Sequence, residues 1–230
     1  MAKIVTAAPV ATISGSIAGQ VYSHNKGGPY IRNRGIPTIS TTPEALAAKS
    51  RLSTEASFWS TITTIQRAAW DSYALQRPVI NALGNPRHLS GFQQFTSINS
   101  RRAFNADARL LVPPIATAPA GLLTLILDAD EGLGDVDLTF TPTPLGATEH
   151  LYFKAAVTNS AGITFVQNLL RLLPFSPAAQ TSPFDIEALV EARLGELIVG
   201  QTLHVEVSVY DNATGLISQP LRDDTVVTTS

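Results

Sequence analysis

A basic and aromatic stretch near the N-terminus, VYSHNKGGPYIRNRG (residues 21–35), carries the side chains with the clearest binding chemistry in this chain. The guanidinium groups of Arg32 and Arg34 suit phosphates and carboxylates, because each presents parallel N–H donors. Lys26 and Tyr22 add an ammonium group and an aromatic ring. The glycines fit neither G-x-G-x-x-G nor G-x-x-x-x-G-K-[ST], so their spacing gives no support for a nucleotide site.

The alternation of this stretch predicts which side chains share a face. The HNKGGP segment favours a turn between two extended strands over residues 13–36. Because strand side chains repeat every two residues, Tyr30, Arg32 and Arg34 are expected on one face of the second strand. We predict a protein interface at Tyr22, Lys26, Tyr30, Arg32 and Arg34. Two alternatives stay open: an edge hairpin kept soluble by charge, and a contact with a nucleic-acid backbone, which the sequence favours least.

A run of carboxylates, DADEGLGDVD, is the candidate for a metal site. Its acidic residues are Asp128, Asp130, Glu131, Asp135 and Asp137. Carboxylates at a turn can hold Ca²⁺, but the run lacks the glutamate that an EF-hand loop carries at its twelfth position. The sequence favours a solvated acidic turn and leaves calcium binding open, and we expect no cofactor.

Catalytic motifs are missing from the sequence. The four histidines, His24, His88, His150 and His204, show no H-x-x-H or H-E-x-x-H spacing. No G-x-S-x-G element supports a serine nucleophile, and the chain contains no cysteine. The sequon at Asn212 is interpreted as turn chemistry. We therefore predict a protein that is not an enzyme.

Charged residues are scarce and unevenly distributed. They make up 15% of the chain, against about 25% in typical soluble domains. Residues 1–110 hold 12 Lys and Arg against 4 Asp and Glu, whereas residues 111–230 hold 4 against 14. These features favour a surface partly covered by neighbouring subunits, with different partners for the two halves. A Thr/Ala/Ser-rich solvated surface and a simple difference in composition are the alternatives.

Targeting and membrane signals are not expected. The N-terminal segment MAKIVTAAPVATISG has no apolar core long enough for a secretory signal. No apolar run approaches the roughly 18 residues of a membrane-spanning helix.

A proline-rich segment, VPPIATAPAG, predicts a linker at residues 112–121. We expect an N-terminal arm and helical assembly domain over residues 1–111 and a β-sandwich domain over residues 122–230. The two-stranded arm is too small to be stable alone, so it needs a partner in this chain or in another.

Capping signals place helices on both sides of this linker. Thr42 with Pro43 at the first helical position, and Ser90 before GFQQF, mark two helix starts, and TTIQRAAWDSYALQ predicts a helix between them. After the linker, alternating segments separated by turns predict short strands. A short helix, with Ser182 as its cap, Pro183 at its first position and Gly195 at its end, interrupts them. The predicted fold class is α+β, with an immunoglobulin or fibronectin III-like β-sandwich at the C-terminal end.

Four segments together resemble a family of uncharacterised structural-type proteins from tailed phages and prophages. They are SGSIAGQVYSHNKGGPYIRNRGIPT, TTPEALAAKSRL, FWSTIT…QRAAWDSYA and LSGFQQFTSINSRR. That family combines a glycine-rich N-terminal arm, tryptophan-bearing helices and a fibronectin-like C-terminal domain. The resemblance covers most of the chain and implies a virion structural protein.

The function expected from the sequence is therefore a non-enzymatic virion component: a capsid decoration, connector or tail protein that assembles through its N-terminal half. Its expected partners are other virion proteins and copies of itself in a homo-oligomer, with no membrane, and nucleic acid is the least favoured partner. It would be made in the host cytoplasm and reside in the virion. The alternative is a surface or glycan-binding module whose β-sandwich is a receptor domain. The sequence leaves the position in the particle and the copy number open.

Overall fold

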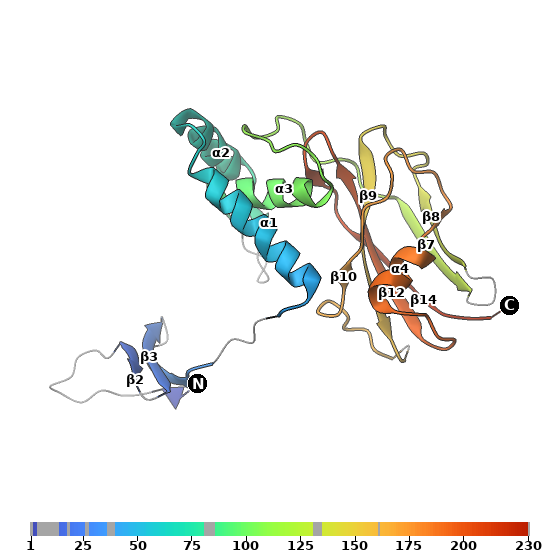
Figure 1. The fold of residues 1–230 in the computed structure, drawn as a ribbon, viewed down its shortest axis with the longest axis horizontal. Coiled ribbons are helices and arrows are strands. Elements are labelled where there is room, and N and C mark those ends of the chain that lie inside the picture. Colours follow the sequence, from blue (N-terminus) through green and yellow to red (C-terminus); the bar gives the residue numbers. More distant parts are fainter. Residues whose placement is uncertain are drawn as a thin grey trace. The chain divides into compact units, whose positions relative to one another are not determined.

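The chain forms two compact units, Met1–Ala47 and Ala48–Ser230. The computed structural model describes residues 2–3, 14–17, 19–25, 28–35, 40–80, 86–130, 135–160 and 162–229, and Figure 1 gives the order of the elements along the chain. The division falls inside the first helix, α1 (Pro43–Trp59). The predicted linker at residues 112–121 lies within the second unit, so the chain does not divide there.

The first unit contains a four-stranded antiparallel sheet rather than the expected two-stranded hairpin. Its strands are β1 (Ala2–Lys3), β2 (Gly15–Ile17), β3 (Gln20–Asn25) and β4 (Gly28–Asn33), in the order β1-β4-β3-β2. The first predicted strand is broken because Gly19 has a φ of +82°, a conformation that glycine adopts without strain. The chain reverses there, and Ile17 pairs with Gln20. The Gly19 carbonyl also accepts a hydrogen bond from the Arg34 amide at 2.7 Å.

The three helices predicted before the linker are α1, α2 (Thr64–Gln76) and α3 (Gly91–Phe104). α1 and α3 begin where the predicted caps Thr42 and Ser90 place them, and α2 falls within the predicted segment TTIQRAAWDSYALQ. Thr63 and Gln66 form a capping box at the start of α2, and Ser90 and Gln93 form another at the start of α3. A two-stranded ribbon of β5 (Val79–Ile80) and β6 (Pro86–Arg87) lies between these two helices in the sequence.

The rest of the second unit is built from two antiparallel sheets and a short helix. The first sheet has the order β11-β8-β7, from β7 (Thr124–Asp130), β8 (Asp135–Thr141) and β11 (Phe184–Asp185). The second has the order β10-β9-β12-β13, with β14 also paired to β12. Its strands are β9 (Glu149–Thr158), β10 (Arg171–Leu172), β12 (Thr202–Asp211), β13 (Leu216–Ile217) and β14 (Leu221–Val226). Four helices and several antiparallel sheets in the described residues confirm the predicted α+β class.

The short helix α4 (Glu187–Leu194) begins four residues later than the sequence predicts, at Glu187 instead of Pro183. Ser182 is not its cap, because the Ser182 hydroxyl instead accepts a hydrogen bond from the Phe140 amide at 3.0 Å. Ile186 occupies the N-cap position and makes no side-chain cap. The predicted end is confirmed: Gly195 terminates the helix with a φ of +93°.

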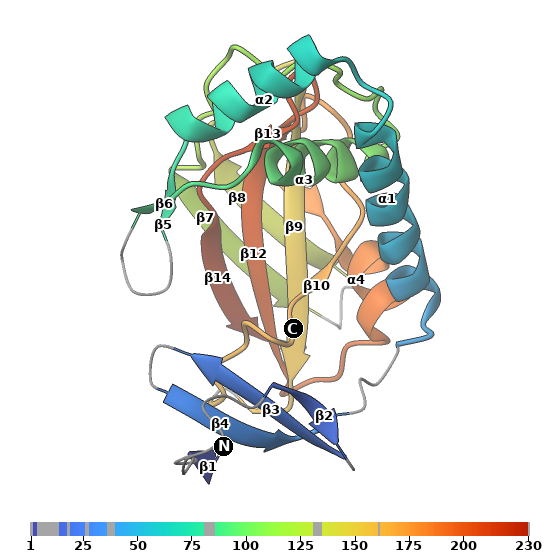
Figure 2. The same cartoon turned by 90° about the vertical axis from the view of Figure 1, so that its left-hand side faces the viewer.

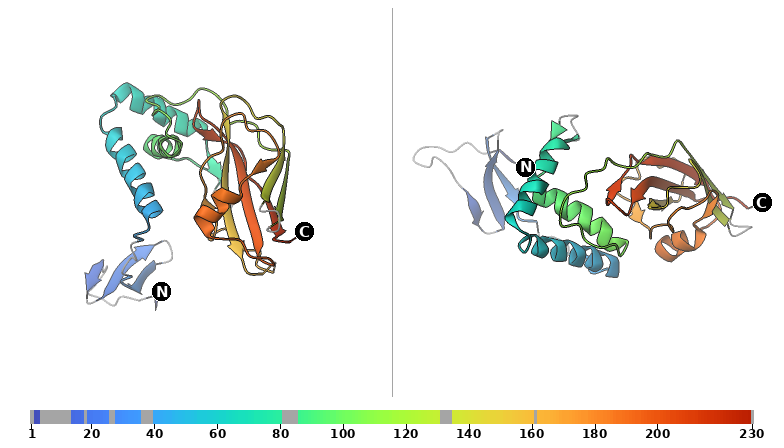
Figure 3. Two further views of the ribbon diagram at one scale, coloured as in Figure 1. Left: turned by 45° about the vertical axis from the view of Figure 1, so that its right-hand side comes forward. Right: turned by 90° about the horizontal axis from the view of Figure 1, so that it is seen from above.

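One hydrophobic core lies between the two sheets. Alternate residues of β12, from Leu203 to Val209, pack there with Leu138, Phe140 and Phe153. The remaining residues of β12 are also buried, except Asp211 at the strand end. The second sheet is therefore covered on both faces, and Figure 3 shows α4 beside it and the three N-terminal helices on the far side from β7 and β8.

The helices pack directly on this sheet, which explains why the chain does not divide at residues 112–121. A second core joins Ile62, Trp70, Tyr73, Phe95, Ile98 and Leu216 of β13. Figure 2 shows α2 and α3 across one end of β9 and β12. Tyr210 of β12 donates a hydrogen bond to Asp107 at 2.6 Å, and Arg102 of α3 donates to the carbonyl of Asn212. Composition and prolines in the connecting segment do not reveal these contacts.

Candidate functional site

The N-terminal sheet brings together part of the predicted interface. Ser23 is opposite Tyr30, and Val21 is opposite Arg32, so Tyr30 and Arg32 share one face, as predicted. Tyr22 is opposite Ile31 and therefore lies on the other face.

The structure does not assign the two remaining interface residues to a face. Arg34 follows the end of β4, where its backbone rather than its side chain is held, by Gly19. Lys26 lies outside the described residues. The interface role of all five residues remains a prediction.

This sheet contains no buried side chain among the described residues 14–35 whose exposure is defined. Tyr22 and Tyr30 are half-buried, and Arg32 and Arg34 are exposed. Neither hydrophobic core includes a residue from the described part of the first unit. A small sheet ordinarily needs a packed apolar face to be stable. Among the described residues, one face of this sheet carries the half-buried Tyr30 and the exposed Arg32.

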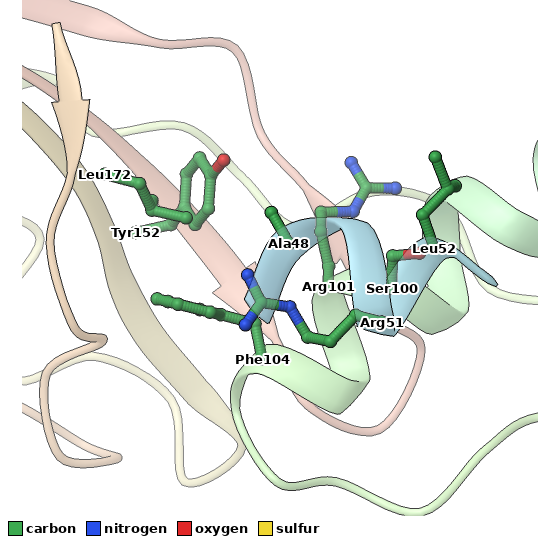
Figure 4. Close-up of a pocket in the computed structure, with 8 residues that line it drawn as sticks. All are labelled: Ala48, Arg51, Leu52, Ser100, Arg101, Phe104, Tyr152 and Leu172. Atoms are coloured by element: carbon green, nitrogen blue, oxygen red, sulfur yellow. The ribbon is translucent and has the colours of Figure 1, made fainter. Parts of the chain in front are cut away.

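A second candidate site is a crevice in the second unit between α1, α3 and the edge formed by β9 and β10 (Figure 4). Its volume is about 170 Å³. Its lining residues are Ala48, Arg51 and Leu52 of α1, Ser100, Arg101 and Phe104 of α3, and Tyr152 and Leu172 of the sheet. The aromatic lining continues inward, because Phe175 contacts both Phe104 and Tyr152 with ring centroids 5.4 and 5.3 Å apart.

The two arginines of this crevice have no ion-pair partner among the described residues. The Arg51 guanidinium lies 4.8 Å from the centre of the Phe104 ring. Burial lowers the pKa of Arg101, an effect that the neighbouring phenols of Tyr152 and Tyr210 partly oppose. The Nε atom of Arg101 and the hydroxyl of Ser100 are buried without a hydrogen-bond partner.

Arg109 shows the opposite arrangement. It binds the buried Glu55 carboxylate with two hydrogen bonds, at 2.5 and 2.7 Å. The side-chain hydrogen bond with Glu55 raises the pKa of Arg109. Helix spacing would pair Glu55 with Arg51, four residues earlier. Because Arg109 binds the Glu55 carboxylate, Arg51 has no carboxylate partner from its own helix and lines the crevice. The pairing of Glu55 with Arg109 is evident only from the folded structure.

The histidines are dispersed over the described part of the chain and do not form a catalytic group there. His24 and His88 are exposed. His150 is buried, with its Nδ1 atom 2.7 Å from the Ser176 carbonyl. His204 is buried on β12, with its Nε2 atom 3.2 Å from the Thr158 hydroxyl. Each of the two buried histidines therefore has a hydrogen-bond partner within the second unit.

The predicted acidic turn extends into a row of carboxylates. Asp137 of β8 is opposite Asp128 of β7 on one side and Asp185 of β11 on the other. Desolvation, followed by repulsion from Asp135, Asp185 and Asp128, raises the pKa of Asp137. Within the described ranges, which exclude Glu131, no group of three or more His, Asp or Glu side chains is arranged to hold a metal ion.

Comparison with known proteins gives no family assignment. No protein-family model, no curated protein and no solved structure matches this chain. Among the described residues, no helix is long and apolar enough to cross a membrane.

Proposed function

We propose that this chain is a non-enzymatic structural subunit of a tailed-phage virion that assembles through its N-terminal half. The observation that carries the assembly role is the sheet of the first unit, in which no described side chain with a defined exposure is buried and Tyr30 and Arg32 share one face. The virion assignment comes from the resemblance of the arm, the tryptophan-bearing helices and the SGFQQF segment to phage structural-type proteins. The partners would be other virion proteins and copies of this chain, in a capsid-decorating, connector or tail position.

We also propose that the C-terminal elements form a fibronectin III-like sandwich. With β7, β8, β9, β10, β11, β12 and β14 taken as strands A, B, C, C′, E, F and G, the two sheets have the orders E-B-A and C′-C-F-G. Immunoglobulin-like folds likewise separate strands A, B and E from strands C, F and G. The strand order and the shared core between the sheets support this assignment.

The assembly role is tested with particles that lack the protein. Wild-type protein should bind them, whereas a double variant, Tyr30→Ala with Arg32→Glu, should not. The matched control is Arg87→Glu, which reverses an exposed charge on β6 of the second unit. Wild-type protein that stays monomeric and does not bind the particles would contradict the proposal.

A glycan-binding receptor domain is the second candidate. Phe165 favours it, because this side chain is 74% exposed in the connection between β9 and β10 and could stack on a sugar. Phe153 and Tyr210 are fully buried and cannot serve this purpose. A glycan array should show binding that Phe165→Ala abolishes, and an array without hits would remove this candidate.

A further inference from the structure

The arginine-containing crevice is incomplete in a single chain. Arg101 is desolvated, its Nε atom has no acceptor, and Arg51 has lost its helix-spaced carboxylate to Arg109. Arg101 is half-buried, and a partly desolvated cation without an anion is unfavourable because its desolvation is not offset by an ion pair. The chemistry of the crevice therefore fits a carboxylate attached to an apolar stem, with the charge at the arginines and the stem against Phe104 and Leu52.

The size of the crevice decides what kind of molecule can carry that carboxylate. Pockets for small organic ligands usually measure about 300–1,000 Å³. The crevice, at about 170 Å³, is below that range. Its volume suits one or two amino-acid side chains presented by another polypeptide.

A loop of the same chain has the complementary chemistry. Residues 195–200, GELIVG, connect α4 to β12, and Leu197 anchors them because its side chain is only 4% exposed. Around this anchor, Glu196 is exposed and has no ion-pair or hydrogen-bond partner among the described residues. Ile198 and Val199 are 60% and 47% exposed. The loop thus presents one unpaired carboxylate and two aliphatic side chains.

We propose that the 195–200 loop of one copy docks in the crevice of the next copy, with Glu196 paired to Arg51 and Arg101. The crevice and the loop are different patches of the same unit, so the contact is heterologous and repeats from copy to copy. Such contacts build rings or filaments. The inference rests on the proposed function as an assembly subunit, and it adds a contact in which the N-terminal sheet takes no part.

Cross-linking tests this contact directly, because the chain has no cysteine. Full-length Leu52→Cys, at the rim of the crevice, is mixed with full-length Val199→Cys and treated with a short bismaleimide. The mixture should give a cross-linked dimer that neither variant gives alone. The matched control replaces Leu52→Cys with Leu75→Cys, an exposed leucine of α2 outside the crevice. No mixed dimer, or equal cross-linking with the control, would overturn the proposal.

Charge reversal identifies the ion pair. Placing Arg51→Glu in the Leu52→Cys chain should reduce the yield by about tenfold or more, because like charges then meet in the contact. Adding Glu196→Arg to the Val199→Cys chain should restore it. Unchanged yield with Arg51→Glu would overturn the pairing. If Leu52→Cys and Val199→Cys give no mixed dimer, but the Tyr30→Ala/Arg32→Glu variant fails to bind particles, this loop contact is refuted and the proposed function stands. If the mixed dimer forms, but the Tyr30→Ala/Arg32→Glu variant still binds particles, only the assembly role of the N-terminal sheet is refuted.

Discussion

The central strand β12 of the second unit and strand β4 of the first unit show two different ways of building a sheet. In β12, nine of ten residues are buried, because one face packs on the core and the other is covered by loops and helices. In β4, Tyr30 and Ile31 are only half-buried, and Arg32 is exposed. The comparison teaches that the second unit supplies its own core, whereas no described side chain of the N-terminal sheet with a defined exposure is buried. In our proposal, a partner supplies the contacts that this sheet lacks.

The largest expected effect tests whether the second unit is self-sufficient. Phe153→Ala removes a fully buried ring from the core and should lower the free energy of unfolding by about 3–5 kcal/mol. Urea unfolding followed by the fluorescence of Trp59 and Trp70, which both lie in this unit, measures it. Tyr30→Ala should change the same transition by about 0.5 kcal/mol or less. A change of several kcal/mol on Tyr30→Ala would contradict the expectation that the second unit is stable without the N-terminal sheet.

A second test compares Arg102, which bonds α3 to the chain after β12, with Arg101, which lines the crevice. Arg102 is 7% exposed and donates hydrogen bonds to the carbonyls of Ala108 and Asn212. Arg102→Met should cost about 2–3 kcal/mol, because two acceptors lose a charged partner. Arg101→Met should leave stability unchanged or raise it, because it removes a desolvated cation without an anion. Equal destabilisation by the two variants, measured by urea unfolding, would contradict this.

Gly215 and Gly19 both have a positive φ, but an added side chain would be crowded only at Gly215. At Gly215, with φ of +71°, an added Cβ would lie 2.8 Å from the Cγ2 atom of Ile98. Gly215→Ala should therefore cost about 1–3 kcal/mol through both strain and crowding at the helix–sheet contact. At Gly19, with φ of +82°, no atom lies within 4 Å of the added Cβ. Gly19→Ala should leave the transition of the second unit unchanged and loosen only the β2–β3 turn, which amide exchange of residues 15–25 would detect.

The smallest expected effect concerns pH. Burial alone would raise the pKa of Glu206, but hydrogen bonds from Lys154 and Arg222 outweigh it and lower this pKa. Because the folded pKa is below the unfolded one, the stabilisation is fully present above the unfolded value of about 4.3. It is lost as pH falls through the folded pKa. Glu206→Gln should flatten the fall in stability of the second unit below about pH 5. Parallel curves for wild type and variant would refute this assignment.

Local signals predicted much of this fold because they act within a few residues. The capping residues Thr42 and Ser90 predict two helix starts, and the alternation in β7, β8, β9 and β12 identifies the strands. The break at Gly19 was missed, because alternation on both sides of a glycine resembles one continuous strand. The docking of α3 on β12 was also missed, since it depends on contacts such as Tyr210 with Asp107, 103 residues apart.

The candidate sites were predictable to different degrees. The shared face of Tyr30 and Arg32 follows from a period of two and needs only correct strand assignment. The crevice could not be predicted, because Arg51 is left unpaired only when Arg109 binds Glu55 from 54 residues away. Its one sequence signal is Arg101, which has no acidic residue three or four positions away on α3.

Hydrogen exchange of the N-terminal sheet in the free and particle-bound protein tests the central claim most directly. We predict that the amides of β3 and β4 exchange rapidly in free full-length protein, because none of the described side chains of this sheet with a defined exposure is buried. In the bound protein they should become strongly protected, whereas the amides of β12 should be protected in both states. Strong protection of β3 and β4 in the free monomer, or no change on binding, would contradict the account.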